Sequence, residues 1–314
     1  MLINLVPEFL NVLKTADRRS AYLNYLATHS AVLAAYWRNY VIDPQSPQAS
    51  DIIERIVGAD RSDLRVLLET TDLTAMVEDT AARAEDVLQV DRPTDTYLMV
   101  GVGAANAGEL VVRGRGVAFA CLEHFTGRAN PETSGLGLDP GLIPLWIAHE
   151  LAHAVRYTSP GSASELRHLI DDSGGYYDVW QAGSRVSLGE LLLNEGLAVH
   201  AAQAVVPGFD PAAYFGYARR QYHRLRELEA FLRQTTEPDL ERAALGLKLR
   251  YLTDGVGPAS RLVAGRVLPQ RAGYYLGYRM ATALVQEVGI ARALRASTEE
   301  LLAADRTARG IRTA

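Results

Sequence analysis

Two histidines and a glutamate follow one another as His149-Glu150-x-x-His153 inside an apolar stretch of the chain. On an α-helix, residues four apart share one face, with Cβ atoms about 5–6 Å apart, so both imidazoles can bind one metal ion. A catalytic zinc site keeps one position for water and lowers the pKa of that water to about 7. Glu150 is placed to take the proton of this water. The spacing therefore predicts a hydrolytic zinc site.

The alternative interpretation is a pair of hydrogen-bonded histidines in an ordinary core. Asp139 is a typical N-cap residue and Pro140 suits a first helical position, so the motif is expected on a helix. This helix is apolar on nearly all sides, which predicts that it is buried. Buried polar groups without partners cost about 1–3 kcal/mol each. A zinc ion and a water would satisfy both histidines and the glutamate, which favours the metal site.

Glu195 is the candidate for a third protein ligand. Ser187 and Glu190 form a capping box that predicts the start of a second apolar helix, with Glu195 in its middle. Glu190 is expected to be used by the cap and lies about 140° around the helix from Glu195. His200 also faces another direction. The connecting loop offers three further carboxylates that stay open as ligands, Asp171, Asp172 and Asp178.

An HExxH helix followed by a separate helix carrying Asn194-Glu195-Gly196-Leu197-Ala198 resembles the gluzincin metallopeptidases. With 41 residues between His153 and Glu195, the chain is most similar to a bacterial family described as predicted zinc-dependent proteases. The resemblance implies a zincin-like fold, a Zn²⁺ cofactor and metallopeptidase activity. It also implies that His149, His153 and Glu195 bind the metal.

The elements that would position these residues divide into three parts. Residues 1–90 read as a helical N-terminal region, residues 91–206 as a catalytic core with the two metal-binding helices, and residues 207–314 as a helical C-terminal lobe. Short β-branched runs between 96 and 122, separated by glycine-rich turns, predict a small and mainly antiparallel sheet beside the HExxH helix. The expected fold class is therefore α+β and predominantly helical.

The resemblance also places the edge of the sheet, where an extended substrate would pair, at the run that ends in residues 122–125. Glu123 at its end would then hold a substrate amine, or it is a surface carboxylate at the end of a strand. The long connection between residues 158 and 185 is rich in glycine, serine and aromatic residues, and it is a candidate wall or lid over the cleft.

A late segment carries two tyrosines that are candidates for catalysis. Gly273 and Gly277 are four residues apart, which indicates a close backbone approach on one helix face. Tyr274 and Tyr278 share a neighbouring face. Either phenol, or the guanidinium of Arg279, could stabilise the oxyanion of a tetrahedral intermediate, as a late tyrosine does in the gluzincins that the chain resembles.

The composition excludes several classes of protein. The 314 residues are 48% hydrophobic with a net charge of −5, so the chain can bury a large core and has no basic footprint for nucleic acid or an anionic membrane. No apolar run approaches the roughly 18 residues of a membrane span, and residues 1–8 lack the pattern of a signal peptide. The single Cys121 allows no internal disulfide. We therefore expect a cytoplasmic protein.

The function expected from these observations is zinc-dependent hydrolysis of a peptide bond in a peptide or protein substrate, with Glu150 as the general base acting on a metal-activated water. Two other classes stay open. One is a zinc-dependent amidase or other hydrolase of a non-peptide substrate. The other is a non-catalytic protein in which zinc serves folding or sensing, although such a site normally fills all four positions and needs no base.

Overall fold

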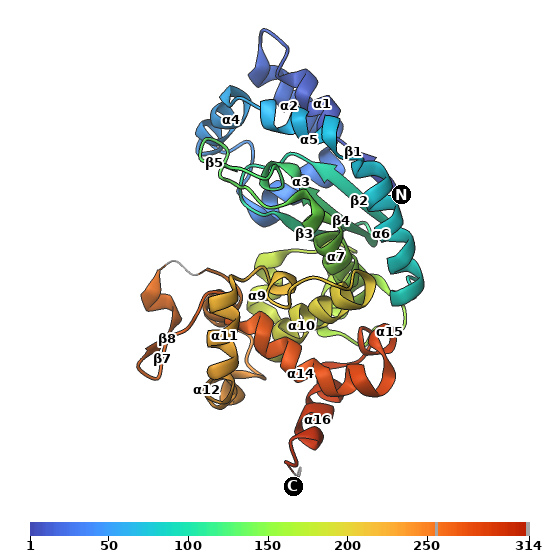
Figure 1. Ribbon diagram of the computed structural model, residues 1–314, viewed down its shortest axis with the longest axis vertical. Coiled ribbons are helices and arrows are strands. Elements are labelled where there is room, and N and C mark those ends of the chain that lie inside the picture. The colour runs from blue at the N-terminus through green and yellow to red at the C-terminus, as the bar shows by residue number, and fades with distance from the viewer. Residues whose placement is uncertain (255–256, 312–314) are drawn as a thin grey trace.

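Helices make up most of the chain in the computed structural model, which describes residues 1–254 and 257–311 (Figure 1). The α-helices are α1 (Val6–Val12), α2 (Arg18–Thr28), α3 (Ser30–Tyr40), α4 (Ala49–Gly58), α5 (Ser62–Thr70), α6 (Leu73–Leu88), α7 (Ile143–Thr158), α8 (Glu165–Asp172), α9 (Val179–Arg185), α10 (Leu188–Val205), α11 (Arg219–Glu227), α12 (Glu229–Thr236), α13 (Leu245–Leu252), α14 (Ala272–Val288), α15 (Ile290–Ala293) and α16 (Thr298–Ala308). The strands are β1 (Leu2–Asn4), β2 (Thr94–Met99), β3 (Ala107–Val112), β4 (Arg115–Cys121), β5 (Ala129–Asn130), β6 (Gly135–Leu136), β7 (Leu262–Val263) and β8 (Arg266–Val267).

The main sheet has four strands in the order β1-β2-β4-β3. β2 pairs in parallel with both of its neighbours, whereas β3 and β4 form an antiparallel hairpin with Ala107 opposite Ala120. The two short ladders, β5 with β6 and β7 with β8, are also antiparallel. β1 pairs with β2 from a distant part of the chain, whereas β2 and β4 pair in parallel because β3, which lies between them in sequence, takes the outer side of β4. Local sequence patterns reveal neither pairing. β3 is therefore an edge strand, and β4 lies inside the sheet.

Helices cover both faces of this sheet. Gly116 of β4 faces α7, since a Cβ atom there would lie 3.0 Å from the Cβ of Ala154. Three residues along, Phe119 points to the opposite face and meets Tyr36 and Tyr40 of α3 edge-on. Side chains alternate between the faces of a strand, so Ala118 and its partner Glu109 on β3 face α7. This alternation places the Glu109 carboxylate on the face of the sheet that the HExxH helix covers.

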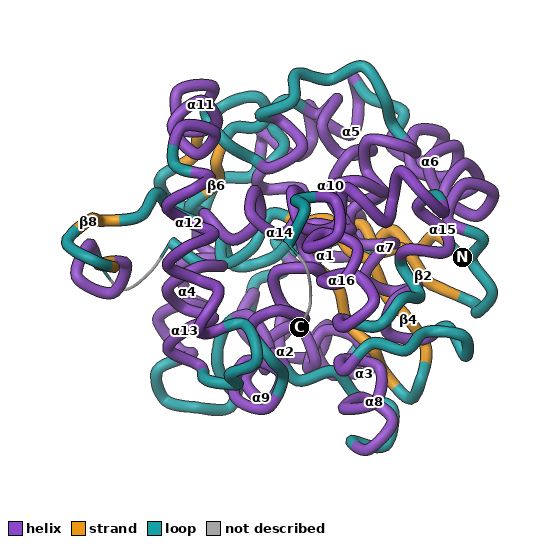
Figure 2. The backbone as a smooth tube through the Cα atoms, turned by 90° about the horizontal axis from the view of Figure 1, so that it is seen from below, coloured by secondary structure: helices purple, strands orange, loops and turns teal. Residues whose placement is uncertain are grey.

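Below α7, the helices α10 and α14 form the centre of the C-terminal half. α10 packs against both α7 and α14, and α14 packs against α16. Figure 2 shows α10, α14 and α16 near the middle of the molecule, with the strands of the sheet beside them. The HExxH helix thus lies between the sheet and α10.

The structure confirms the predicted fold class, α+β and predominantly helical, with the sheet beside the helix of the HExxH motif. The predicted boundaries near residues 90 and 206 fall after α6 and after α10, and the division into three domains stays a prediction. Within residues 1–254 and 257–311, no helix is long and apolar enough to cross a membrane.

Candidate metal centre

α7 carries the HExxH residues into the interior. Asp139 accepts a hydrogen bond from the Gly141 N–H and opens a short 3₁₀ turn, which leads directly into α7. The helix is buried along almost its whole length, as its apolar composition predicted. The exposed fractions of His149, Glu150 and His153 are 2%, 5% and 2%. These side chains therefore meet other protein groups rather than bulk water.

α10 begins at the predicted cap, because the Ser187 hydroxyl accepts a hydrogen bond from the Glu190 N–H. The second half of the predicted capping box is wrong. The Ser187 N–H donates to Glu165, and Glu190 instead forms a buried ion pair with Arg156 of α7. A buried guanidinium outcompetes the backbone N–H for this carboxylate. The helix continues to Val205, with Glu195 half-way along it.

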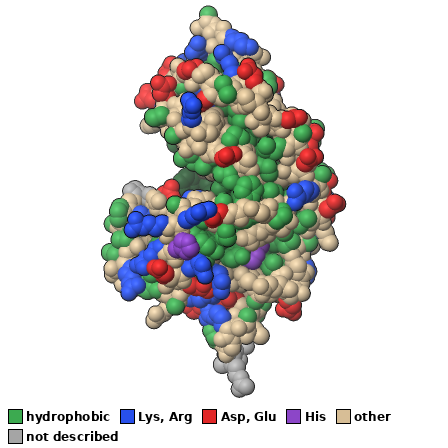
Figure 3. Space-filling view, viewed as in Figure 1, with side chains coloured by type: hydrophobic (Ala, Val, Ile, Leu, Met, Phe, Trp, Pro, Cys, Tyr) green, Lys and Arg blue, Asp and Glu red, His purple; other side chains and the backbone are tan. Residues whose placement is uncertain are grey.

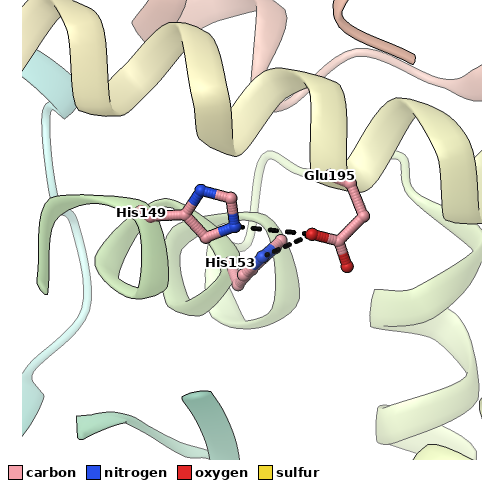
Figure 4. A group of neighbouring side chains, drawn as sticks. All are labelled: His149, His153 and Glu195. Carbon is pink, nitrogen blue, oxygen red and sulfur yellow. Dashed lines mark hydrogen bonds and ion pairs between the residues drawn. The ribbon is translucent and has the colours of Figure 1, made fainter. Parts of the chain in front are cut away.

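His149, His153 and Glu195 converge between the two helices (Figure 4). The Glu195 Oε2 atom lies 3.4 Å from His149 Nε2 and 3.6 Å from His153 Nε2. Two ligand atoms that are each about 2.0–2.1 Å from a tetrahedral zinc ion are about 3.4 Å apart. The separations of these donor atoms therefore fit a single zinc ion, and the set of two imidazoles and one carboxylate is typical of a catalytic site.

Electrostatics in this group hold a proton on His153 while no cation is bound. Burial disfavours the imidazolium, but the carboxylates of Glu195, Glu109 and Glu150 outweigh burial and raise the pKa of His153 to about 10. Burial lowers the pKa of His149, although Glu195 opposes that effect. The pKa of Glu195 is lowered because the two imidazoles outweigh its own burial. A cation that binds here replaces the proton of His153.

Glu150 faces a second carboxylate, Glu109 of β3, which the sequence analysis missed. Glu109, Glu150 and His153 each offer a ligand atom within 4.8 Å of the others. Burial, with Glu109 and Glu195 nearby, raises the pKa of Glu150 well above its usual range. The hydroxyls of Tyr40 and Tyr157 donate to Glu109. The one feature of the sequence that could have pointed to Glu109 is its place as an acidic residue directly before the apolar run of residues 110–112.

A cavity of about 550 Å³ opens onto these side chains. Its walls come from residues 103–109, from the tip of the long connection at Tyr177 and Val179, and from Lys248 and Arg271. In Figure 3 the surface is hollowed between the upper part of the molecule, with the sheet, and the C-terminal helices below. The long connection thus forms part of the wall, as predicted for it.

Residues 176–303 match the model of a family described as predicted Zn-dependent protease. The donor set of two imidazoles and one carboxylate suggests the same general function. The matched part contains Glu195 and Tyr274 and begins after His153. No match to a curated protein or to a solved structure was found.

The two candidate tyrosines, Tyr274 and Tyr278, have different surroundings in the structure. The Tyr274 ring stacks on His149 with 6.2 Å between ring centroids, and Tyr274 lines the cavity. The Tyr278 ring stacks on His200 at 4.1 Å and contacts Phe215, away from the three candidate ligands. Of the two tyrosines, Tyr274 lines the cavity because the packing of α14 against α10 brings the earlier turn of this helix face to it.

The rival metal ligands lie elsewhere. His200 Nε2 is 3.1 Å from the Tyr278 carbonyl oxygen, and burial lowers the pKa of His200 to about 4. Asp178 caps α9, and Asp171 pairs with Arg167 at 3.2 Å. Asp172, Asp171 and Asp178 all lie outside the groups of ligand atoms that the described residues form. Arg279, the third candidate for the oxyanion, pairs with Glu229.

The predicted substrate-binding edge and its glutamate need correction. The 122–125 run follows β4, which is an interior strand, so the edge that borders the cavity is β3. Glu123 is 1% exposed, and its two oxygens accept hydrogen bonds from the N–H groups of Gly101 and Gly103. Both expectations for Glu123 are therefore wrong, because it is neither a surface carboxylate nor open to a substrate amine; it holds the turn that contains Gly101 and Gly103.

Proposed function

We propose that the protein is a zinc-dependent peptidase of the gluzincin type. One observation carries the proposal: two imidazoles from α7 and one carboxylate from α10 lie at the mutual distances of zinc ligands, 3.4 and 3.6 Å, at the wall of a cavity. The match of residues 176–303 to a family described as predicted Zn-dependent protease supports it. His149, His153 and Glu195 would hold the zinc ion.

Zinc at this position would supply Lewis-acid chemistry, polarising a substrate carbonyl and acidifying water. Glu150 then acts as the general base and accepts a proton from the attacking water on a carboxylate oxygen. It passes that proton to the nitrogen of the leaving amine, which completes the cleavage of the peptide bond. Burial raises the pKa of Glu150, which makes its carboxylate a stronger base.

Tyr274 is the group that would stabilise the oxyanion formed when the carbonyl is attacked. Its ring lies beside His149 at the same cavity wall. Burial raises the pKa of Tyr274 well above its usual range, so the phenol keeps its proton and acts as a hydrogen-bond donor. Tyr278 and Arg279 take no part, since their side chains are engaged with His200 and Glu229.

The experiment compares the wild-type protein with Glu150→Gln and Glu195→Gln. Each zinc-loaded protein is incubated with a mixture of short peptides, and mass spectrometry identifies the products. The wild-type protein should cleave peptide bonds, and Glu150→Gln should bind zinc normally but lose about 10²–10⁴ in rate.

Glu195→Gln should weaken zinc binding itself, by on the order of 100-fold or more, since even partners outside the ligand set are worth 10–100-fold. Full activity in Glu150→Gln would refute the mechanism. Unchanged zinc affinity in Glu195→Gln would refute the ligand set.

A further inference from the structure

Lys248 places a positive charge in the wall of the same cavity that the candidate ligands border. It belongs to α13, which packs against α9 and α14. Its stem packs over Gly183 of α9, where a Cβ atom would lie 2.8 Å from Lys248 Cδ. The ammonium Nζ donates to the Val179 carbonyl oxygen at 2.9 Å. The side chain is therefore held in a fixed direction.

This charge has no close counter-ion. Among the residues that the structure describes, no carboxylate oxygen lies within 4.0 Å of the Lys248 ammonium. An ammonium has three N–H donors, and the carbonyl of Val179 uses one of them. Burial lowers the pKa of Lys248, and the more distant carboxylates of Glu109, Glu195 and Asp178 oppose this only in part. Lys248 is half-buried, and a charge that is partly removed from water is costly without a partner unless a ligand supplies one.

Arg271, the other cation in the cavity wall, is already engaged. Its guanidinium lies 3.5 Å from Asp254, donates to the Gly216 carbonyl oxygen at 3.0 Å and sits over the Tyr274 ring. Arg271 thus has a carboxylate partner, whereas among the described residues Lys248 is the cation of this wall without one.

We propose that Lys248 binds a carboxylate of the substrate, so that the enzyme selects peptides with a negative charge close to the scissile bond. This inference rests on the proposed peptidase function. The carboxylate has two sources, the free C-terminus of a short peptide or the side chain of an aspartate or glutamate. Both would complete an ion pair with charge-assisted hydrogen bonds inside a cavity of about 550 Å³.

The test uses zinc-loaded protein and four N-acetylated peptides of one sequence. The first pair differs only in a free C-terminal carboxylate or a C-terminal amide. The second pair, both amidated, differs only in Glu or Gln near the scissile bond. The preferred member of a pair should be cleaved with a kcat/KM about 10- to 100-fold higher. The pair that shows the preference identifies the source of the carboxylate.

Matched variants assign the preference to one side chain. Lys248→Met keeps the apolar stem over Gly183 and should abolish the preference within the pair. Lys248→Arg keeps the charge and should retain most of the preference. The chain has one other lysine, Lys14, which is exposed, so Lys14→Met is the control and should behave as the wild-type protein. Equal cleavage within both pairs, or a preference that survives Lys248→Met, would overturn the proposal.

A binding measurement separates this inference from the peptidase function. With two lysines in the chain, biosynthetic labelling with ¹³C,¹⁵N-lysine gives side-chain NMR signals that the two methionine variants assign, and it leaves the N–H donors of Lys248 unmodified. A carboxylate-bearing peptide should shift the Lys248 signal, and its neutral partner should not. If that shift occurs without any cleavage, carboxylate recognition stands and the peptidase function fails. If neither charged peptide moves the signal, carboxylate recognition by Lys248 fails.

Discussion

Gly196 and Gly277 bring the backbones of α10 and α14 into contact: a methyl group on Gly196 would lie 2.0 Å from the Gly277 carbonyl carbon. On Gly277 it would lie 1.7 Å from the Leu192 carbonyl oxygen. Gly196 directly follows Glu195, and Gly277 lies one turn after Tyr274. The contact therefore fixes the distance between the helix of the third candidate ligand and the helix of the cavity tyrosine.

Gly277→Ala should force these helices apart. We expect the free energy of unfolding to fall by about 3 kcal/mol or more, because the added methyl meets backbone that cannot move alone. Urea unfolding of the metal-free protein measures this change. Gly246→Ala, in α13 with no atom within 4 Å of the new Cβ, is the control and should be neutral or slightly stabilising. Equal effects of the two substitutions would contradict the close approach.

Tyr274→Phe and Tyr278→Phe separate the two phenols. Removing the Tyr274 hydroxyl should lower kcat by about 10²–10³ with a smaller change in KM, because the donor acts on the oxyanion of the transition state. The Tyr278 ring stacks on His200, so Tyr278→Phe should leave both constants nearly unchanged. Steady-state kinetics on one peptide substrate would decide. A loss of kcat in Tyr278→Phe alone would reverse the assignment.

Arg156 and Glu190 join α7 to α10 one turn beyond His153. Arg156 Nη2 lies 2.6 Å from Glu190 Oε2, and Nη1 donates to the carbonyls of Leu294 and Ala296 at 2.9 and 3.0 Å. Arg156→Met should lower the free energy of unfolding by about 3–5 kcal/mol, since it leaves a buried carboxylate without its cation.

Changing Glu190 to Met as well should recover part of this loss. The exposed pair of Arg224 and Glu227, 3.0 Å apart, provides the control. Arg224→Met should cost at most about 1 kcal/mol. Denaturant midpoints of the four proteins give the comparison, and a small effect of Arg156→Met would contradict the buried ion pair.

Zinc affinity should increase with pH. In the metal-free protein His153 has a pKa of about 10, so below that pH the metal must displace its proton. The apparent affinity should rise by up to about tenfold per unit between pH 6 and 9. Competition with a chelating dye measures it. In Glu195→Gln the pKa of His153 should fall, and the rise should level off at a lower pH. An affinity independent of pH would show that His153 carries no proton in the metal-free protein.

Local patterns in the sequence predicted much of what surrounds the candidate metal centre. The position of His149 and His153 on one face follows from helical geometry alone, because residues four apart share a face. The apolar flanks of Glu195 predicted a carboxylate inside the protein, and the structure brings it to both imidazoles. Gly277 predicted a close contact with another helix, because a glycine lowers helix propensity and brings no local benefit.

Tertiary structure decided the rest. Glu109 reaches Glu150 only because β3 is an edge strand whose pairing with β4 turns that side chain toward α7. Lys248 enters the cavity from a helix nearly a hundred residues after Glu150, and Tyr274 rather than Tyr278 does so because of how α14 packs on α10. A sequence fixes which side chains share a face of one element, whereas the packing of elements distant in the chain determines what that face meets.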